Sequence, residues 1–80
     1  MSYSSHRHAT LDESLPLANR ASHARSCAIH VANKLGVKRD AVIASIAAST
    51  GVSLHQPGSG TELNIAMAAM DVLRTTALAG

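Results

Sequence analysis

The sequence predicts an all-α protein, a single small domain of three to four helices. Apolar residues recur at helical spacing in three segments, fifteen of the 80 residues are alanine, and glycine or proline separates the segments. The chain is too short for two hydrophobic cores, and its single cysteine excludes a disulfide framework. We therefore expect one helical domain over residues 11–80.

The first ten residues are polar, contain His6 and His8, and show no periodic pattern. This composition predicts a disordered N-terminal arm over residues 1–10. The arm lacks the apolar stretch of a secretory signal, and no apolar run in the chain reaches the length of a membrane span. We expect a cytoplasmic protein that makes no membrane contact.

The first predicted helix follows Asp12, a residue type that caps helices, and Pro16 is tolerated in its first turn. The helix ends at Gly36, the expected left-handed cap. The sequence leaves open whether the helix runs unbroken from Asp12 to Leu35 or bends near residues 22–26. Apolar residues recur in alternating steps of four and three at Leu17, Ala21, Ala24, Ala28, Val31 and Leu35.

A second helix is predicted from about Lys38 to Thr50, and it stops at Gly51. Ala41, Val42 and Ile46 share one face of this helix, which predicts that they point inward.

A third helix follows the loop over residues 52–60, where Ser59 with Glu62, or Thr61 alone, can cap its start. Apolar residues cover most of its circumference, so we expect it to be covered on more than one side as an oligomerisation or partner-docking element. The alternative is that this third helix is the central helix of a compact monomer. One apolar face comprises Leu63, Ala66, Met67, Met70, Leu73 and Ala77, and a second comprises Ile65, Ala69, Val72 and Thr76.

The alanine-rich composition favours association of subunits. Alanine buries little apolar surface, and the chain contains neither Phe nor Trp. At about 25 cal/mol per Å², one copy gains less from burial than an ordinary domain of this length. We therefore expect a homodimer or a partner-bound form. The predicted partner or dimer interface comprises Ile65, Met67, Met70, Val72, Leu73 and Ile43.

The boundary between the first two helices has the pattern of a tight helical hairpin. Ala32 is small where the helices cross, and Gly36 supplies the positive φ of the turn. Val37, Val42 and Ile46 are placed to fill the wedge between the helices. Over residues 28–47 the chain resembles the helix-turn-helix of the Cro and lambda-repressor type. This resemblance implies that the first helix crosses the DNA backbone and that the second enters the major groove.

The charge pattern is compatible with such a partner, although the formal net charge is only +2. Between Ser14 and Arg39 the chain has no acidic residue, and a stretch of one sign favours a polyanion. The alternative is an ordinary solvated basic face. The predicted DNA-binding residues are Lys38, Arg39, Arg20, Arg25 and Lys34.

The resemblance also implies that Lys38, Arg39 and Asp40 open the recognition helix. Ile43, Ala44 and Ala47 then lie on its exposed face, where polar residues usually reach base edges. Because this face is aliphatic, two alternatives stay open. The protein binds DNA mainly through phosphate contacts, or this face packs against another protein.

Three residues of the first helix, His23, Cys27 and His30, share one side and have the donor types of a zinc or copper site. A fourth ligand such as His55 would be needed. A lone cysteine among alanines is more often a small buried hydrophobic residue, and we expect no metal and no cofactor. The five carboxylates form no spaced acid–base pair, so we expect no enzyme.

The sequence thus predicts a small DNA-binding transcriptional regulator of helix-turn-helix type that acts as a homodimer. The alternative is a small helical adaptor or inhibitor, of the kind found in mobile elements, that binds and blocks another protein.

Overall fold

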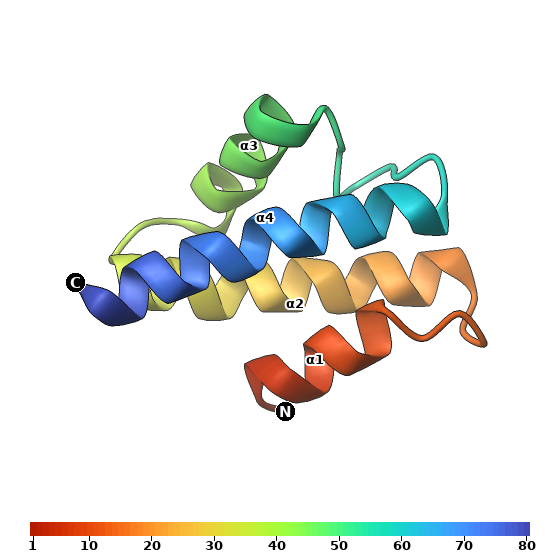
Figure 1. Cartoon of the computed structure of the whole chain (residues 1–80), viewed down its shortest axis with the longest axis horizontal. Helices are drawn as coiled ribbons and strands as arrows, with labels where there is room; N and C mark the ends of the chain where they lie inside the picture. Colours follow the sequence, from red (N-terminus) through yellow and green to blue (C-terminus); the bar gives the residue numbers. More distant parts are fainter.

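A computed structural model describes residues 1–80 and contains helices but no strands, which confirms the predicted all-α class (Figure 1). The four helices are α1 (Tyr3–Thr10), α2 (Leu17–Leu35), α3 (Arg39–Thr50) and α4 (Gly60–Ala79). None of them is both long enough and apolar enough to cross a lipid bilayer.

The two long helices, α2 and α4, lie side by side and run in the same direction (Figure 1). Their starts are joined by a hydrogen bond from Arg20 to Asn64. Helix α1 packs along one side of this pair, mainly against α2, and α3 crosses on the other side. The long loop between α3 and α4 returns the chain to the end where α2 begins.

The glycine and serine signals at the helix ends are confirmed. Gly36 and Gly51 adopt left-handed backbone angles, with φ of 70° and 76°, and they end α2 and α3. The Ser59 hydroxyl accepts a hydrogen bond from the Glu62 N–H and caps α4. The predicted Asp12 cap is wrong, because Asp12 accepts instead from the N–H and hydroxyl of Ser14 within the loop. Helix α2 begins at residue 17 and runs unbroken to residue 35.

The core combines small residues from α2 with larger residues from the other segments. Its largest fully buried side chains include Ile46 of α3 and three residues of α4, Leu63, Met67 and Met70. The loop over residues 51–59 adds Leu54, which is 0% exposed. Alanines at the α2 contacts let neighbouring helices approach closely, and the larger side chains fill the remaining volume. The core beside α2 therefore includes a loop residue, Leu54, that helical periodicity does not predict.

The N-terminal segment is helix α1 rather than the predicted disordered arm. Ser2 caps it by accepting a hydrogen bond from the Ser5 N–H. Tyr3 and Thr10 lie seven residues apart, on the same face, and are buried against the rest of the domain. Because the ordering contacts come from distant segments, the local sequence does not reveal the helix.

Helix α3 is rotated relative to the prediction. Val42 and Ile46 are buried as expected, but Ala41 is exposed and Ile43 takes the inward position at 6% exposure. Val37 is 47% exposed and does not fill the wedge between α2 and α3. A larger apolar side chain gains more from burial than alanine, which favours Ile43 in the core over Ala41.

Candidate interaction surfaces

The corner between α2 and α3 presents three cations to solvent, and we call Lys34, Lys38 and Arg39 the basic corner. All three are exposed. Gly36 turns the chain sharply between them, and Lys38 directly precedes the first turn of α3. Asp40 reduces the positive charge, since its carboxylate lies 3.4 Å from the Arg39 guanidinium. The basic corner has the charge to hold an anion but offers few side chains that read bases.

Arg20 does not belong to a phosphate-binding surface, contrary to the prediction. It is only 6% exposed, and its Nε donates to the Thr10 carbonyl at 2.8 Å. A second nitrogen donates to Asn64. Buried guanidinium groups require such partners because desolvation of an unpaired charge is costly. Arg20 therefore ties the end of α1 to the starts of α2 and α4.

Arg25 is also a structural residue rather than a free cation. It is half-buried, and its guanidinium donates to the Leu54 carbonyl at 2.8 Å. This hydrogen bond holds the α3–α4 loop against α2. The predicted DNA-binding set is thereby reduced to the three residues of the basic corner, for which DNA contact remains a prediction.

The side of α4 opposite its buried residues is uncharged and mostly apolar, and we call it the outer face of α4. Ile65 and Val72 are 49% and 65% exposed on it. The remaining exposed members, spaced to share this face, are Thr61, Ala68, Thr76 and Ala79. The hydroxyl of Thr76 donates to the backbone carbonyl of Val72 at 3.0 Å. The outer face therefore presents two large apolar side chains among small ones.

Three residues predicted for the partner interface lie in the core instead. Ile43, Met67 and Met70 are 6%, 1% and 0% exposed. Leu73 is partly buried and packs against the same core. These side chains are covered within a single chain, where α2, α3 and α4 pack against one another. Ile65 and Val72 are the two predicted interface residues that stay exposed.

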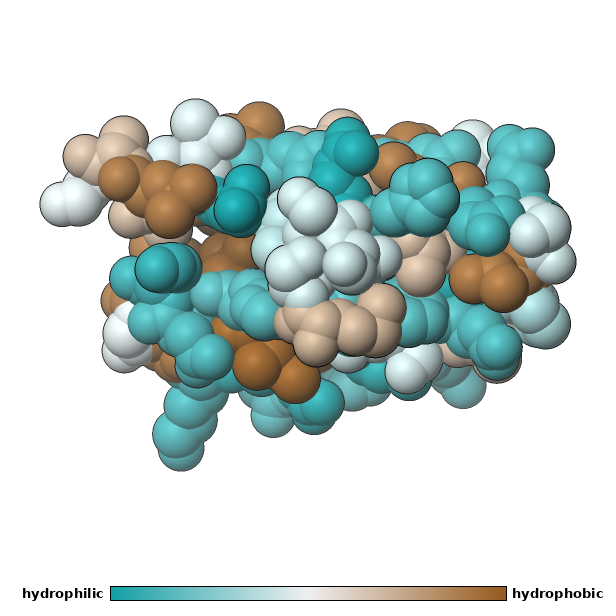
Figure 2. All heavy atoms as spheres, turned by 90° about the horizontal axis from the view of Figure 1, so that it is seen from below, coloured by the Kyte–Doolittle hydropathy of each residue, from teal (hydrophilic) through white to brown (hydrophobic).

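The surface around α1 is polar, and Asp71 of α4 is its main anchor. The carboxylate accepts from the Tyr3 hydroxyl at 2.7 Å and from Arg7 Nε at 3.0 Å. The Arg74 guanidinium lies 4.4 Å from the centre of the Tyr3 ring. Figure 2, seen from the side of α1, shows mainly hydrophilic and near-neutral residues over the middle of this face, with hydrophobic residues at both ends and along its edges.

Three imidazole rings lie together where α1 meets α2. His6 Nδ1 is 2.9 Å from His23 Nδ1, and the His6 ring centre is 5.7 Å from that of His30. Cys27 lies between the two α2 histidines in sequence but is fully buried, and its Sγ faces the Tyr3 carbonyl at 3.9 Å. No three His, Cys, Asp or Glu side chains are grouped so as to hold a metal ion. The His23, Cys27 and His30 side chains thus do not converge.

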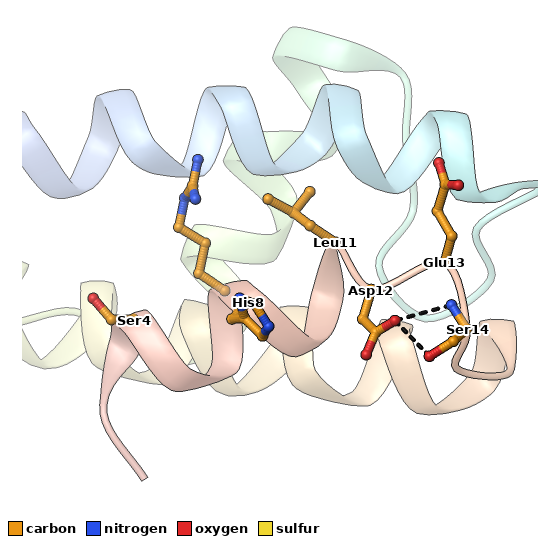
Figure 3. A pocket seen from close by; sticks show the side chains of 7 residues that line it. Ser4, His8, Leu11, Asp12, Glu13 and Ser14 are labelled. Carbon is orange, nitrogen blue, oxygen red and sulfur yellow. Dashed lines mark hydrogen bonds between the residues drawn. The ribbon is translucent and has the colours of Figure 1, made fainter.

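A shallow hollow of about 610 Å³ lies beside α1 and the loop that follows it. Figure 3 shows its labelled side chains pointing in different directions rather than toward a common point. The Asp12 carboxylate is already bonded to Ser14, and Arg7 is paired with Asp71. The hollow therefore has no convergent set of polar groups.

Comparison with protein-family models, with curated proteins and with solved structures found no match to this chain.

Proposed function

We propose that this chain is a small protein-interaction module that pairs with a second copy of itself through the outer face of α4. The observation that supports this function is the exposure of Ile65 and Val72 on a helix whose opposite side already fills the core. Isolated exposed apolar residues are common, but these two lie seven residues apart on one uncharged face. Their burial would add apolar contact without altering the subunit.

A second copy suits this face because nothing on it opposes self-pairing. The face contains no Asp, Glu, Lys or Arg, so two copies meet without repulsion between like charges. The hydroxyls of Thr75 and Thr76 donate to carbonyls of their own helix, at 2.9 and 3.0 Å, and need no outside partner. Ala68 and Ala69 lie between Ile65 and Val72 in sequence and allow close helix approach.

Sedimentation equilibrium over a wide concentration range tests this function. We expect a reversible dimer for the natural sequence and a monomer for the double variant Ile65→Ser, Val72→Ser. Both positions are exposed, so the variant should keep its helical circular dichroism. The matched control is Ile29→Ser on α2, which is 42% exposed and lies off the outer face. A monomer at every concentration, or a double variant that dimerises normally, would contradict the proposal.

A second function, binding of DNA phosphates, is favoured by the basic corner. Arg20 and Arg25 are held internally, yet Lys34 and Lys38 remain exposed with no hydrogen-bond partner in the protein. The first turn of α3 adds unpaired backbone N–H groups, which favour anions. This function corresponds to the DNA-binding regulator predicted from the resemblance, but the basic corner would contact DNA phosphates rather than base edges.

Titration of generic duplex DNA at increasing salt tests the second function. Three phosphate contacts predict a slope of about −3 in log K against log salt. The triple variant Lys34→Ala, Lys38→Ala, Arg39→Ala should lose binding, whereas Asp40→Asn should strengthen it by removing a negative charge from the same corner. Absence of binding at low salt, or a triple variant that binds as tightly as the natural chain, would exclude this function.

A further inference from the structure

The contact between His6 and His23 is sensitive to the number of protons it carries. The two Nδ1 atoms are 2.9 Å apart and form a hydrogen bond between α1 and α2. One nitrogen must donate and the other must accept, so only one of the two Nδ1 atoms can carry a proton. Protonation of both rings places two N–H groups against each other and removes the hydrogen bond.

The charges around this contact increase the effect. On α2, His23 and His30 face His6, with ring centres 5.2 and 5.7 Å from that of His6. On the α1 side, the Met1 amino group adds a further positive charge. Apart from this amino group, the charged groups that act on the pKa of His6 are the two α2 imidazoles, and none is a carboxylate. Helix α4 contributes Asp71 and Arg74 to the α1 interface, where they contact Tyr3 and Arg7 instead.

We propose that α1 is a pH-sensitive cover, which stays docked on α2 near neutral pH and is released when His6 and His23 are both protonated. The docked state lowers the pKa of His6 below its ordinary value, first through burial and then through repulsion by His23. A lowered pKa in the docked state means that docking is fully favoured above the ordinary imidazole value of about 6.5 and weakens as the pH falls below it.

Release of α1 would uncover Cys27, which provides an internal probe. The Cys27 side chain is 0% exposed and contacts the Tyr3 backbone of α1. Burial raises the pKa of Cys27 to about 12, so the docked thiol is unreactive. A free thiol reacts more slowly in acid because its thiolate fraction falls. The rate of Cys27 relative to that of the denatured chain at the same pH therefore reports exposure rather than thiol chemistry.

The test measures the rate at which Cys27 of the full chain reacts with 4,4′-dithiodipyridine at about pH 7.5 and about pH 5.5, on either side of the ordinary imidazole pKa. Each rate is divided by that of the denatured chain at the same pH, which cancels the change in thiolate fraction. We expect this normalised rate to rise in acid, by up to about tenfold per titrating ring at one pH unit below the ordinary imidazole value. Hydrogen exchange should show the loss of protection confined to residues 3–10. Circular dichroism should still report the long helices.

Two variants separate this mechanism from general acid sensitivity. His6→Gln and His23→Gln remove one titrating ring each and should abolish the rate increase. His8→Gln, on the same helix but exposed, should retain it. The proposal is overturned if the normalised rate of Cys27 does not rise in acid, if all helices lose protection together, or if both His6→Gln and His23→Gln respond to pH like the natural chain.

Discussion

The Tyr3 hydroxyl donates a 2.7 Å hydrogen bond to Asp71, a residue 68 positions further along the chain. The same carboxylate pairs with Arg7, and Arg74 stacks on the Tyr3 ring. A single side chain of α4, Asp71, thus contacts two residues of the N-terminal helix α1. Because a hydrogen bond to a charged partner contributes about 1.5 to 3 kcal/mol, this contact is a substantial part of what holds α1 in place.

Titration of Tyr3 should coincide with loss of structure at high pH. Burial, and then the hydrogen bond donated to Asp71, raises the pKa of Tyr3 well above its ordinary value. The raised pKa contributes stability that is fully present below about pH 10 and is lost above it. Tyr3 is the only tyrosine, so tyrosinate absorbance reports it directly. We expect this absorbance to rise together with the loss of helical circular dichroism; a rise near pH 10 with all helices intact would contradict the burial.

Removing the Arg20 guanidinium should destabilise the domain strongly. Arg20→Met keeps an unbranched side chain but leaves the Thr10 carbonyl and the Asn64 side-chain oxygen without their donor. We expect a loss of about 2 to 3 kcal/mol in the free energy of unfolding, measured by urea denaturation. Lys34→Met on the exposed end of α2 is the matched control and should change stability by less than about 0.5 kcal/mol. Equal losses of stability in the two variants would show that the hydrogen bonds of Arg20 within the core do not stabilise the domain.

The left-handed conformation at Gly36 should make any side chain there costly for backbone reasons alone. A Cβ at this position would meet nothing within 4 Å, and φ is +70°. Gly36→Ala is therefore expected to lose about 1 to 2 kcal/mol in thermal or urea unfolding. Gly36→Asn should lose less, because asparagine tolerates this conformation better. An alanine variant as stable as the natural chain would exclude the left-handed turn.

Adjacent glutamate substitutions in α3 should differ sharply in effect. Ile43 is 6% exposed in the core, whereas Ala44 faces solvent. Ile43→Glu buries a carboxylate without a partner and is expected to cost more than about 3 kcal/mol of stability. Ala44→Glu should leave unfolding nearly unchanged. Circular dichroism melts of the two variants measure the difference, and similar melts would place Ile43 outside the core.

Local patterns were sufficient to predict the presence of α2, α3 and α4, the C-terminal ends of α2 and α3 and the start of α4, but not the start of α2. Helix periodicity, the glycines at residues 36 and 51 and the cap at Ser59 act within a few residues, and they operate in the same way in any helical protein. The prediction of α1 as a disordered arm failed because Tyr3 and Thr10 become buried only against residues far along the chain. No short-range signal reports such contacts.

The sequence by itself determined the all-α class, the positions of the three main helices and the tight turn at Gly36. Only the tertiary structure decided which cations and apolar residues remain available for partners. Charge and hydrophobicity do not reveal whether a side chain faces inward. Arg20 and Arg25 bond to backbone carbonyls, and Met67 and Met70 are enclosed, whereas Lys38 and Val72 stay exposed. The physical reason is that burial depends on how helices distant in sequence pack together.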